Sequence, residues 1–151
     1  MKKDSKLSSV LHVLLHMAHS DRALTSEELS GYLQTNAVVV RRTLAGLRAL
    51  GYVEAAKGPG GGWTLSCDLA QVTLRDIYDA VGAPGVFAMG HREEHPQCLV
   101  EQAVNEALDK AFQEAEALLI GRLSGVTLAD LSADFNRRYQ AHPRRKTPHA
   151  H

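Results

Sequence analysis

Hydrophobic and polar positions between residues 25 and 51 predict two short helices joined by a tight turn. Thr25-Ser26-Glu27-Glu28 has the form of a capping box and starts a helix that ends near Leu33. Gln34-Thr35-Asn36 forms the turn, and Asn36 is placed to cap a second helix from Ala37 to Leu50. The second helix has apolar residues at helical spacing, at Val40, Leu44 and Leu47, and Gly51 marks its end.

Two segments able to pair as strands follow, Tyr52–Ala56 and Trp63–Ser66, and they bracket the loop Lys57-Gly58-Pro59-Gly60-Gly61-Gly62. Each glycine loses backbone entropy on ordering and buries no side chain, so a core does not need such a run. The loop lacks the Gly-Lys-Ser/Thr ending of a phosphate-binding loop and does not open a helix, as a dinucleotide fingerprint would. It therefore predicts an exposed hairpin in the form of a wing.

The second helix carries residues that its core face does not use. They lie near the helix N-terminus, the end that recognition helices present to base edges. An arginine fork can bind guanine O6 and N7, and a valine methyl can pack on a thymine methyl. An Arg-Arg pair alone is more typical of a solvated helix face, but the adjacent wing favours DNA reading. The predicted DNA-binding residues are Thr35, Asn36, Val38, Val39, Arg41, Arg42, Lys57, Gly58, Pro59, Gly60 and Gly61.

Three blocks of sequence carry a family resemblance: Leu44-x-x-Leu47-Arg48-x-x-Gly51-Tyr52-Val53, the glycine loop with Trp63 and Leu65, and Val72-Thr73-Leu74-x-Asp76-Ile77. They resemble the BadM/Rrf-two family of bacterial winged helix-turn-helix transcription regulators, over nearly the whole chain from about Lys6 to Tyr139. The resemblance implies a homodimer that binds a near-palindromic operator in double-stranded DNA through the recognition helix and the wing. In many members a basic residue before the wing glycines enters the minor groove. Lys57 holds that place here, where arginine is commoner.

Between Pro96 and Leu123 a long helix is predicted by apolar residues that recur every three or four positions, at Val100, Val104, Ala107, Ala111, Ala115 and Leu118. At 1.5 Å per residue it extends roughly 40 Å, more than a small wing domain covers from one side. Part of this apolar stripe is therefore expected to contact a partner subunit, and internal packing in a monomeric bundle is the alternative. Shorter helices flank it, one capped by Thr73 and one beginning at Thr127.

The predicted fold is mainly α with a small β-hairpin. It has a winged helix-turn-helix DNA-binding domain over residues 1–82, an effector loop and dimerisation helix over 83–140, and a disordered basic tail over 141–151. The formal net charge is zero, yet residues 1–66 hold eight Lys or Arg against five Asp or Glu, and residues 67–136 hold four against twelve. Such segregation lets a locally positive surface face phosphates while the acidic part points away.

No apolar run in the sequence approaches the roughly 20 residues of a membrane span, and the basic start leads into an amphipathic stretch rather than a signal-peptide core. We therefore expect a cytoplasmic protein that does not bind membranes. The two cysteines, Cys67 and Cys98, cannot make a disulfide framework, which suits a reducing compartment.

The effector is the least defined part of the prediction. Many family members hold an iron–sulfur cluster with three cysteines before the long helix, and this chain has only Cys98 there, so a standard cluster is not expected. His91, His95 and Cys98 lie within eight residues, and imidazole with thiolate suits zinc or iron. Two alternatives stay open: a redox switch at the Cys98 thiol, and a buried structural Cys98 beside exposed loop histidines. The cofactor stays unknown.

No nucleophile–base or metallohydrolase motif is present in the sequence, which argues against an enzyme. His12, His16 and His19 on the first helix are more typical of packed or solvent-facing residues than of ligands. The alternative function is a winged helix that binds other proteins without reading DNA sequence, and the basic residues Arg41, Arg42 and Lys57 count against it. The sequence thus predicts a dimeric DNA-binding repressor that responds to a redox, metal or small-molecule signal.

Overall fold

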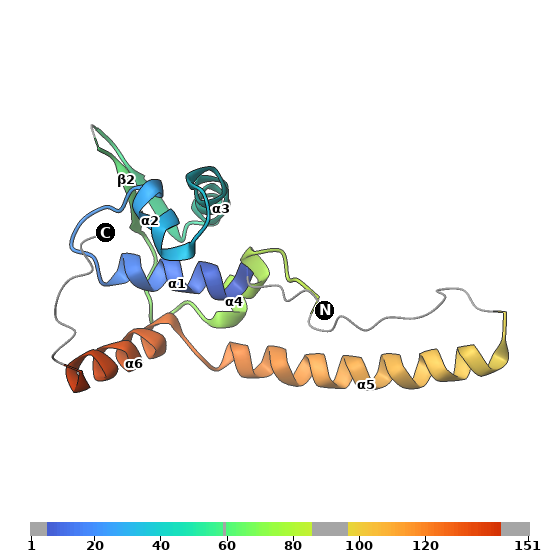
Figure 1. Ribbon diagram of the computed structural model, residues 1–151. Coiled ribbons are helices and arrows are strands. Elements are labelled where there is room, and N and C mark those ends of the chain that lie inside the picture. Colours follow the sequence, from blue (N-terminus) through green and yellow to red (C-terminus); the bar gives the residue numbers. More distant parts are fainter. Residues whose placement is uncertain (1–5, 59, 86–96, 143–151) are drawn as a thin grey trace.

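A computed structural model describes residues 6–58, 60–85 and 97–142. The elements in chain order are α1 (Lys6–Ala18), α2 (Ser26–Leu33), α3 (Ala37–Ala49), β1 (Val53–Ala56), β2 (Gly62–Leu65), α4 (Leu74–Ala80), α5 (Leu99–Ser124) and α6 (Leu128–Ala141). The fold is mainly helical with one antiparallel hairpin, as predicted. In Figure 1, α1 lies between α2 and α3 on one side and α5 and α6 on the other.

Side-chain caps set where the helices begin. Thr25 Oγ1 accepts a hydrogen bond from the Glu28 backbone N–H at 3.1 Å, and the Glu28 carboxylate accepts one from the Thr25 N–H at 3.4 Å, which completes the predicted capping box of α2. Asn36 Oδ1 accepts from the Val39 N–H at 3.0 Å and starts α3, also as predicted. A cap of this kind contributes about 1 kcal/mol. Capping boxes also start α4 and α6, between Thr73 and Asp76 and between Thr127 and Asp130.

The hydrophobic core is built from side chains of α1, α2, α3 and α4, with the first turn of α6 closing it. The helix α1 packs on α2 and α4, and α2 packs on α3. The predicted core face of α3 is confirmed, because Val40, Leu44 and Leu47 are each no more than 2 % exposed. Ile77 of α4 and Leu128 of α6 are fully buried in the same cluster. This core thus supports the buried side of α3, while the opposite side of α3 is exposed.

The hairpin is fastened to the segment between α1 and α2. Val53 pairs with Leu65 and Ala56 with Gly62, and Leu24 adds a short antiparallel bridge to Trp63 on the far side of β2. A Cβ atom on Gly62 would lie 2.6 Å from the Leu24 carbonyl oxygen, closer than such atoms approach. This position therefore requires glycine, because any other residue would place its Cβ against the backbone of Leu24.

The long helix α5 begins at Leu99, with Cys98 as its N-cap, and none of its 26 residues is buried. Figure 1 shows it extending far beyond the other helices. Val100 is 71 % and Leu118 is 65 % exposed. The monomeric-bundle alternative is therefore wrong for the described chain, because its own elements do not cover the stripe. Among the helices that the structure describes, none combines the length and hydrophobicity needed to cross a bilayer.

Candidate nucleic-acid interface

The exposed face of α3 carries the side chains that the sequence proposed for DNA reading. Val38 is 55 % and Val39 is 44 % exposed, although valine is a residue that folding usually buries. Arg41 and Arg42, one turn further along, are exposed as well. The geometry thus places apolar methyl groups beside guanidinium groups at the N-terminal end of one helix, which is a combination suited to thymine and guanine edges.

The turn before α3 fixes how this end is presented. Gln34 adopts the left-handed conformation, with φ 53° and ψ 40°, and ends α2. Thr35 and Asn36 follow and are exposed, and Asn36 caps α3 through its side-chain oxygen. The N-terminus of α3 therefore begins at an exposed turn, where the positive end of its dipole can attract a backbone phosphate.

One acidic residue lies next to this surface. Arg41 Nη1 is 3.4 Å from Glu27 Oε1, and the two side chains are 51 % and 72 % exposed. A pair this exposed contributes little to folding and is screened by salt. The arginine can consequently exchange this carboxylate for a phosphate or a base without a large loss of stability.

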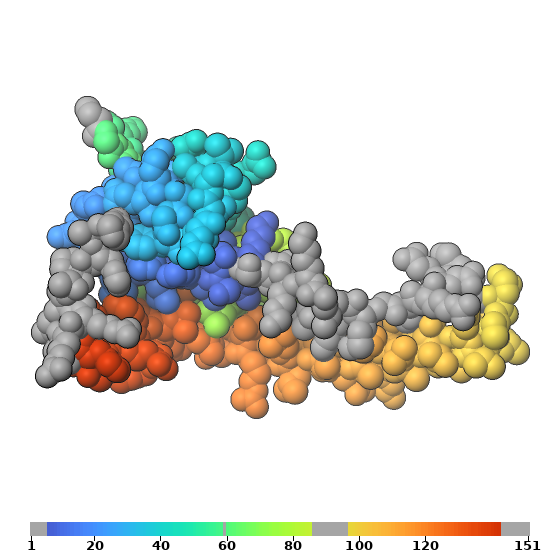
Figure 2. Space-filling view, in the orientation of Figure 1, coloured from blue at the N-terminus to red at the C-terminus, as the bar shows by residue number. Residues whose placement is uncertain are grey.

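The wing lies at the same end of the molecule as α3. Figures 1 and 2 show the hairpin projecting beside α2 and α3, away from α5 and α6. Lys57 and Gly58 are exposed directly after β1, Gly60 is exposed near the tip, and Gly61 is half-buried. Pro59 lies outside the described residues. The structure therefore brings the described wing residues and the α3 residues to one end of the fold, as a DNA reader with two contact elements requires.

Ser26 and Trp63 connect these two contact elements, a role that the sequence analysis did not assign. The Trp63 indole N–H donates to Ser26 Oγ at 3.0 Å, and Ser26 is 6 % exposed. Leu24 and Trp63 also exchange two backbone hydrogen bonds, at 3.1 and 2.8 Å. The wing is thus tied to the start of α2, the helix that packs on α3. In the sequence, the available signal for this contact was the small polar residue Ser26 at the predicted start of a helix.

The candidate effector residues are only partly described. Cys98 is exposed at the start of α5 and its side chain makes no capping hydrogen bond, so the interpretation of Cys98 as a buried structural residue is wrong for a single chain. His91 and His95 lie outside the described residues. Within residues 6–58, 60–85 and 97–142, no group of three or more His, Cys, Asp or Glu side chains is arranged to hold a metal. Burial raises the pKa of the Cys67 thiol, which disfavours its reactive thiolate.

Two of the three N-terminal histidines contact neighbouring helices: His16, in α1, and His19, directly after it. His16 Nε2 lies 2.8 Å from His12 Nε2, and the His16 ring stacks on Tyr32 of α2 with ring centroids 3.8 Å apart. His19 Nε2 lies 3.2 Å from Ser132 Oγ of α6, and burial lowers the pKa of His19. His16 and His19 therefore connect this part of the chain to α2 and α6, whereas His12 is exposed, in agreement with the expectation that these histidines are packed or solvent-facing.

The family model of Rrf2, described as an iron-dependent transcriptional regulator, matches residues 3–134. The chain belongs to the Rrf2 family. A relative named "Putative HTH-type transcriptional regulator YwnA", from Bacillus subtilis, is 27% identical over 128 residues that cover 85% of this chain and 95% of that protein. This confirms the resemblance inferred from the glycine loop and its flanking blocks.

Solved structures of similar proteins agree. The crystal structure of a transcriptional regulator from Lactobacillus plantarum matches this Rrf2 protein with a TM-score of 0.73 and 28% identity, over 93% of this chain and 95% of that one. CymR, the global cysteine regulator of Bacillus subtilis, matches with a TM-score of 0.59 and 19% identity over 88% and 97% of the two chains, which supports the fold alone. The protein is therefore a winged-helix transcription regulator that binds DNA, and the family gives no support to an enzyme.

Proposed function

We propose that this Rrf2 protein is a cytoplasmic homodimeric repressor that binds a near-palindromic operator through α3 and the wing. The observation that carries this proposal is the exposure of Val38 and Val39 beside Arg41 and Arg42 on α3. Exposed valines have no folding benefit, but they gain contact area when α3 enters the major groove. Lys57 and the wing glycines supply the second contact, in the neighbouring minor groove or on the backbone.

The proposed division of the chain follows from this arrangement. Residues 1–82 read DNA, residues 83–140 receive the signal and form the dimer, and residues 141–151 add positive charge at the end of the chain. The apolar face of α5 supports the dimer, because burying a valine or leucine side chain contributes about 1.5–3 kcal/mol. The alanines Ala107, Ala111 and Ala115 lie on the same stripe and let a second helix approach closely. In such a pair the two α3 helices read related half-sites.

The test is operator binding by fluorescence anisotropy with genomic fragments, at several salt concentrations. Arg42→Ala and Lys57→Ala are each expected to weaken binding by about 1–3 kcal/mol while leaving the unfolding temperature unchanged. Lys110→Ala, on α5 and away from α3, removes one positive charge as a matched control. The loss of Lys57 also reduces the salt dependence of binding if that residue contacts a phosphate.

Unchanged operator affinity in both variants would remove the assignment of α3 and the wing as DNA-contacting elements. If the protein shows no salt-dependent binding to random duplex DNA, it would instead act as a protein-interaction module. The signal that controls operator binding is proposed to act at Cys98, either as a ligand to a metal or as an oxidisable thiol.

A further inference from the structure

A hollow that is open to solvent lies between the last turn of α3 and the base of the wing. Arg48 of α3 and Lys57, directly after β1, both line it, and both are exposed. Its lining also includes Gly51, Glu54 and Ser66, which are exposed as well. We call it the α3–wing hollow. Its lining carries two positive charges and one negative charge, and the two cations come from different elements of the fold.

The turn that follows α3 connects the two sides of the hollow. Gly51 has φ 85°, which lets the chain leave α3 and enter β1. The Ser66 hydroxyl donates to the Gly51 carbonyl oxygen at 2.9 Å, and the Ser66 N–H donates to the Tyr52 carbonyl oxygen at 3.0 Å. These bonds fasten the end of β2 to the turn. Because the hydroxyl proton of Ser66 is used in this contact, Ser66 is a positioning residue rather than an anion ligand.

The two cations of the hollow have no carboxylate partner in the part of the chain that the structure describes. Neither Arg48 nor Lys57 takes part in an ion pair there, although Glu54 lines the same hollow. Arg41, in contrast, lies 3.4 Å from a Glu27 carboxylate oxygen. A cation in the last turn of a helix is favourable beside the helix dipole, which accounts for Arg48 alone. The second cation, from another element, indicates an external anion.

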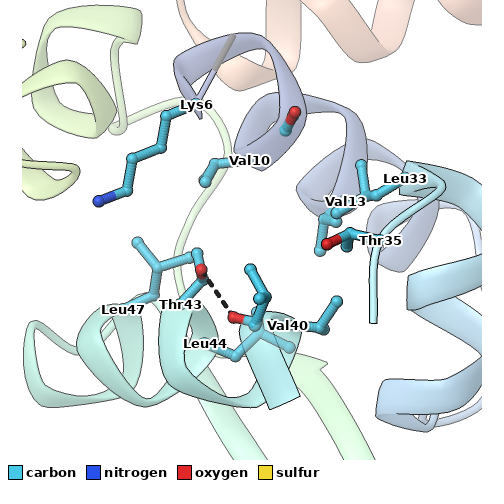
Figure 3. A pocket seen from close by; sticks show the side chains of 11 residues that line it. Lys6, Val10, Val13, Leu33, Thr35, Val40, Thr43, Leu44 and Leu47 are labelled. Atoms are coloured by element: carbon cyan, nitrogen blue, oxygen red, sulfur yellow. Dashed lines mark hydrogen bonds between the residues drawn. The ribbon is translucent and has the colours of Figure 1, made fainter. Parts of the chain in front are cut away.

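Arg48 lies further along α3 than the residues proposed to read bases. Figure 3 shows Leu44 and Leu47 on the side of α3 toward α1, and both are buried. Arg41, Ala45 and Arg48 recur at helical spacing on an exposed side. Arg48 follows Arg41 by two turns, about 10 Å along the helix axis, and the major groove is about 8.5 Å deep. A helix that presents its N-terminal end to the bases therefore carries Arg48 towards the edge of the groove, where the phosphates lie.

The shape of the hollow favours a phosphate that belongs to DNA over a small anion in solution. A small anion is bound tightly where protein surrounds it and excludes water, because exposed charges interact weakly and are screened by salt. The charged residues of this hollow are all exposed. A phosphodiester of the duplex needs no such enclosure, since the other protein–DNA contacts hold it in place.

We propose that the α3–wing hollow binds one phosphodiester group of the DNA backbone, held jointly by Arg48 and Lys57. The guanidinium offers a planar set of donors and the ammonium a compact charge, so the two can bind different oxygens of one phosphate. Such a contact sets the position of α3 and the wing on the duplex and carries no base information. The proposal rests on the proposed function, because it needs duplex DNA at this surface. Random duplex DNA tests it without an operator.

Binding is measured on the full chain by fluorescence anisotropy, with a random duplex and with an operator fragment. Arg48→Ala and Lys57→Ala should each weaken binding to both DNAs about tenfold, the scale of one charge-assisted hydrogen bond, and leave the ratio of the two affinities unchanged. Arg48→Lys keeps the charge and should recover most of the loss. Arg137→Ala removes an equal charge from α6 and should change neither affinity. Glu54→Gln removes the opposing charge and should strengthen binding to both DNAs.

Whether the two residues share one phosphate is tested in two ways. On the random duplex, the double variant Arg48→Ala/Lys57→Ala should lower the salt slope of binding by about one for each bound subunit, whereas two separate phosphates would lower it by about two. On the operator, single phosphates are replaced by neutral methylphosphonates. At one position that weakens binding by the parent, both single variants should show no further loss. This comparison is made within each folded variant, so a change in stability does not imitate it.

Three results would overturn the proposal: unchanged affinity of Arg48→Ala for both DNAs, insensitivity of the two single variants to different phosphates, or a salt slope lowered by about two for each subunit. Competition by inorganic phosphate beyond that of chloride at equal ionic strength, absent in Arg48→Ala, would identify a site for a small anion instead. If Arg42→Ala still weakens operator binding, the proposed function stands in all these cases. A chain that binds no operator, yet loses affinity for random duplex through Arg48→Ala, would refute the proposed function and leave the hollow as a DNA-phosphate site.

Discussion

Replacement of Gly62 by alanine tests whether the backbone contact between the wing and Leu24 holds the wing in its reading position. The new Cβ would lie 2.6 Å from the Leu24 carbonyl oxygen and 3.1 Å from the Thr25 nitrogen. Both neighbours are backbone atoms that cannot rotate away, so β2 has to move. The displacement breaks the two backbone hydrogen bonds between Leu24 and Trp63 and the indole bond to Ser26.

The expected cost follows from these three bonds. Each backbone hydrogen bond contributes about 0.5–1.5 kcal/mol net and the indole bond about 1 kcal/mol, so the free energy of unfolding should fall by about 2–4 kcal/mol. That loss leaves a domain of ordinary stability, about 5–15 kcal/mol, still folded. Operator affinity should fall about tenfold, because the displaced wing no longer lies alongside α3. The measurements are urea unfolding followed by circular dichroism, and anisotropy with operator DNA.

The matched control is Gly60→Ala in the same hairpin. Gly60 has φ 69°, but a Cβ there meets no atom within 4 Å. Alanine at Gly60 therefore carries only the conformational cost of the left-handed region, about 1–2 kcal/mol, and leaves the contact with Leu24 intact. If Gly62→Ala loses no more unfolding free energy and no more operator affinity than Gly60→Ala, the wing is not held through Leu24.

Three further predictions address the dimer, the pH dependence of stability and the effector. Ala111→Glu places a charge on the exposed stripe of α5 and should convert the proposed dimer to a monomer in analytical ultracentrifugation. Gln113→Glu adds the same charge off the stripe and should leave the dimer intact. A dimeric Ala111→Glu protein would exclude α5 as the interface. Burial lowers the pKa of His19, so the folded chain binds this proton less readily than the unfolded chain. The stabilising contribution of neutral His19 is present above the unfolded-state pKa and is lost as pH falls below it. Between pH 7 and pH 5, His19→Gln should therefore lose less unfolding free energy than the parent. Equal losses in the two proteins would contradict this. Mild peroxide or a metal chelator should change operator affinity of the parent but not of Cys98→Ser. A chelator effect that also needs His91 or His95 indicates a metal, a peroxide effect indifferent to both indicates a thiol switch, and an unaltered response in Cys98→Ser would make this cysteine irrelevant to sensing.

Local patterns predicted the elements that make the site. The capping box at Thr25 and the cap at Asn36 depend on side chains three residues apart, so the sequence contains both partners of each interaction. The core face of α3 was equally predictable, because helical spacing determines which residues share a side. Helix ends differed by a few residues: α3 ends at Ala49 rather than Leu50, and α6 continues to Ala141.

Contacts between distant parts of the chain were not predictable in this way. Ser26 and Trp63 are 37 residues apart, and His19 and Ser132 are 113 apart. Neither the period of a helix nor the alternation of a strand indicates which remote element will lie alongside. The packing of whole elements therefore determined the features that sequence reasoning missed.

The position of Cys98 imposes a condition on any signal that acts there. Cys98 precedes the first turn of α5, and the other end of this 26-residue helix lies near α4 and α6, so about 39 Å of helix separates the cysteine from the wing domain of its own chain. A change at Cys98 is thus too remote to move α3 of the same chain by direct contact. In a symmetric pair whose α5 helices run antiparallel, however, the Cys98 end of one helix lies beside the wing domain of the partner. A signal would then act across the subunit boundary and change the separation of two α3 helices that must match half-sites about 34 Å apart. The proposed sensing by Cys98 consequently requires the dimer that the exposed apolar face of α5 is proposed to form.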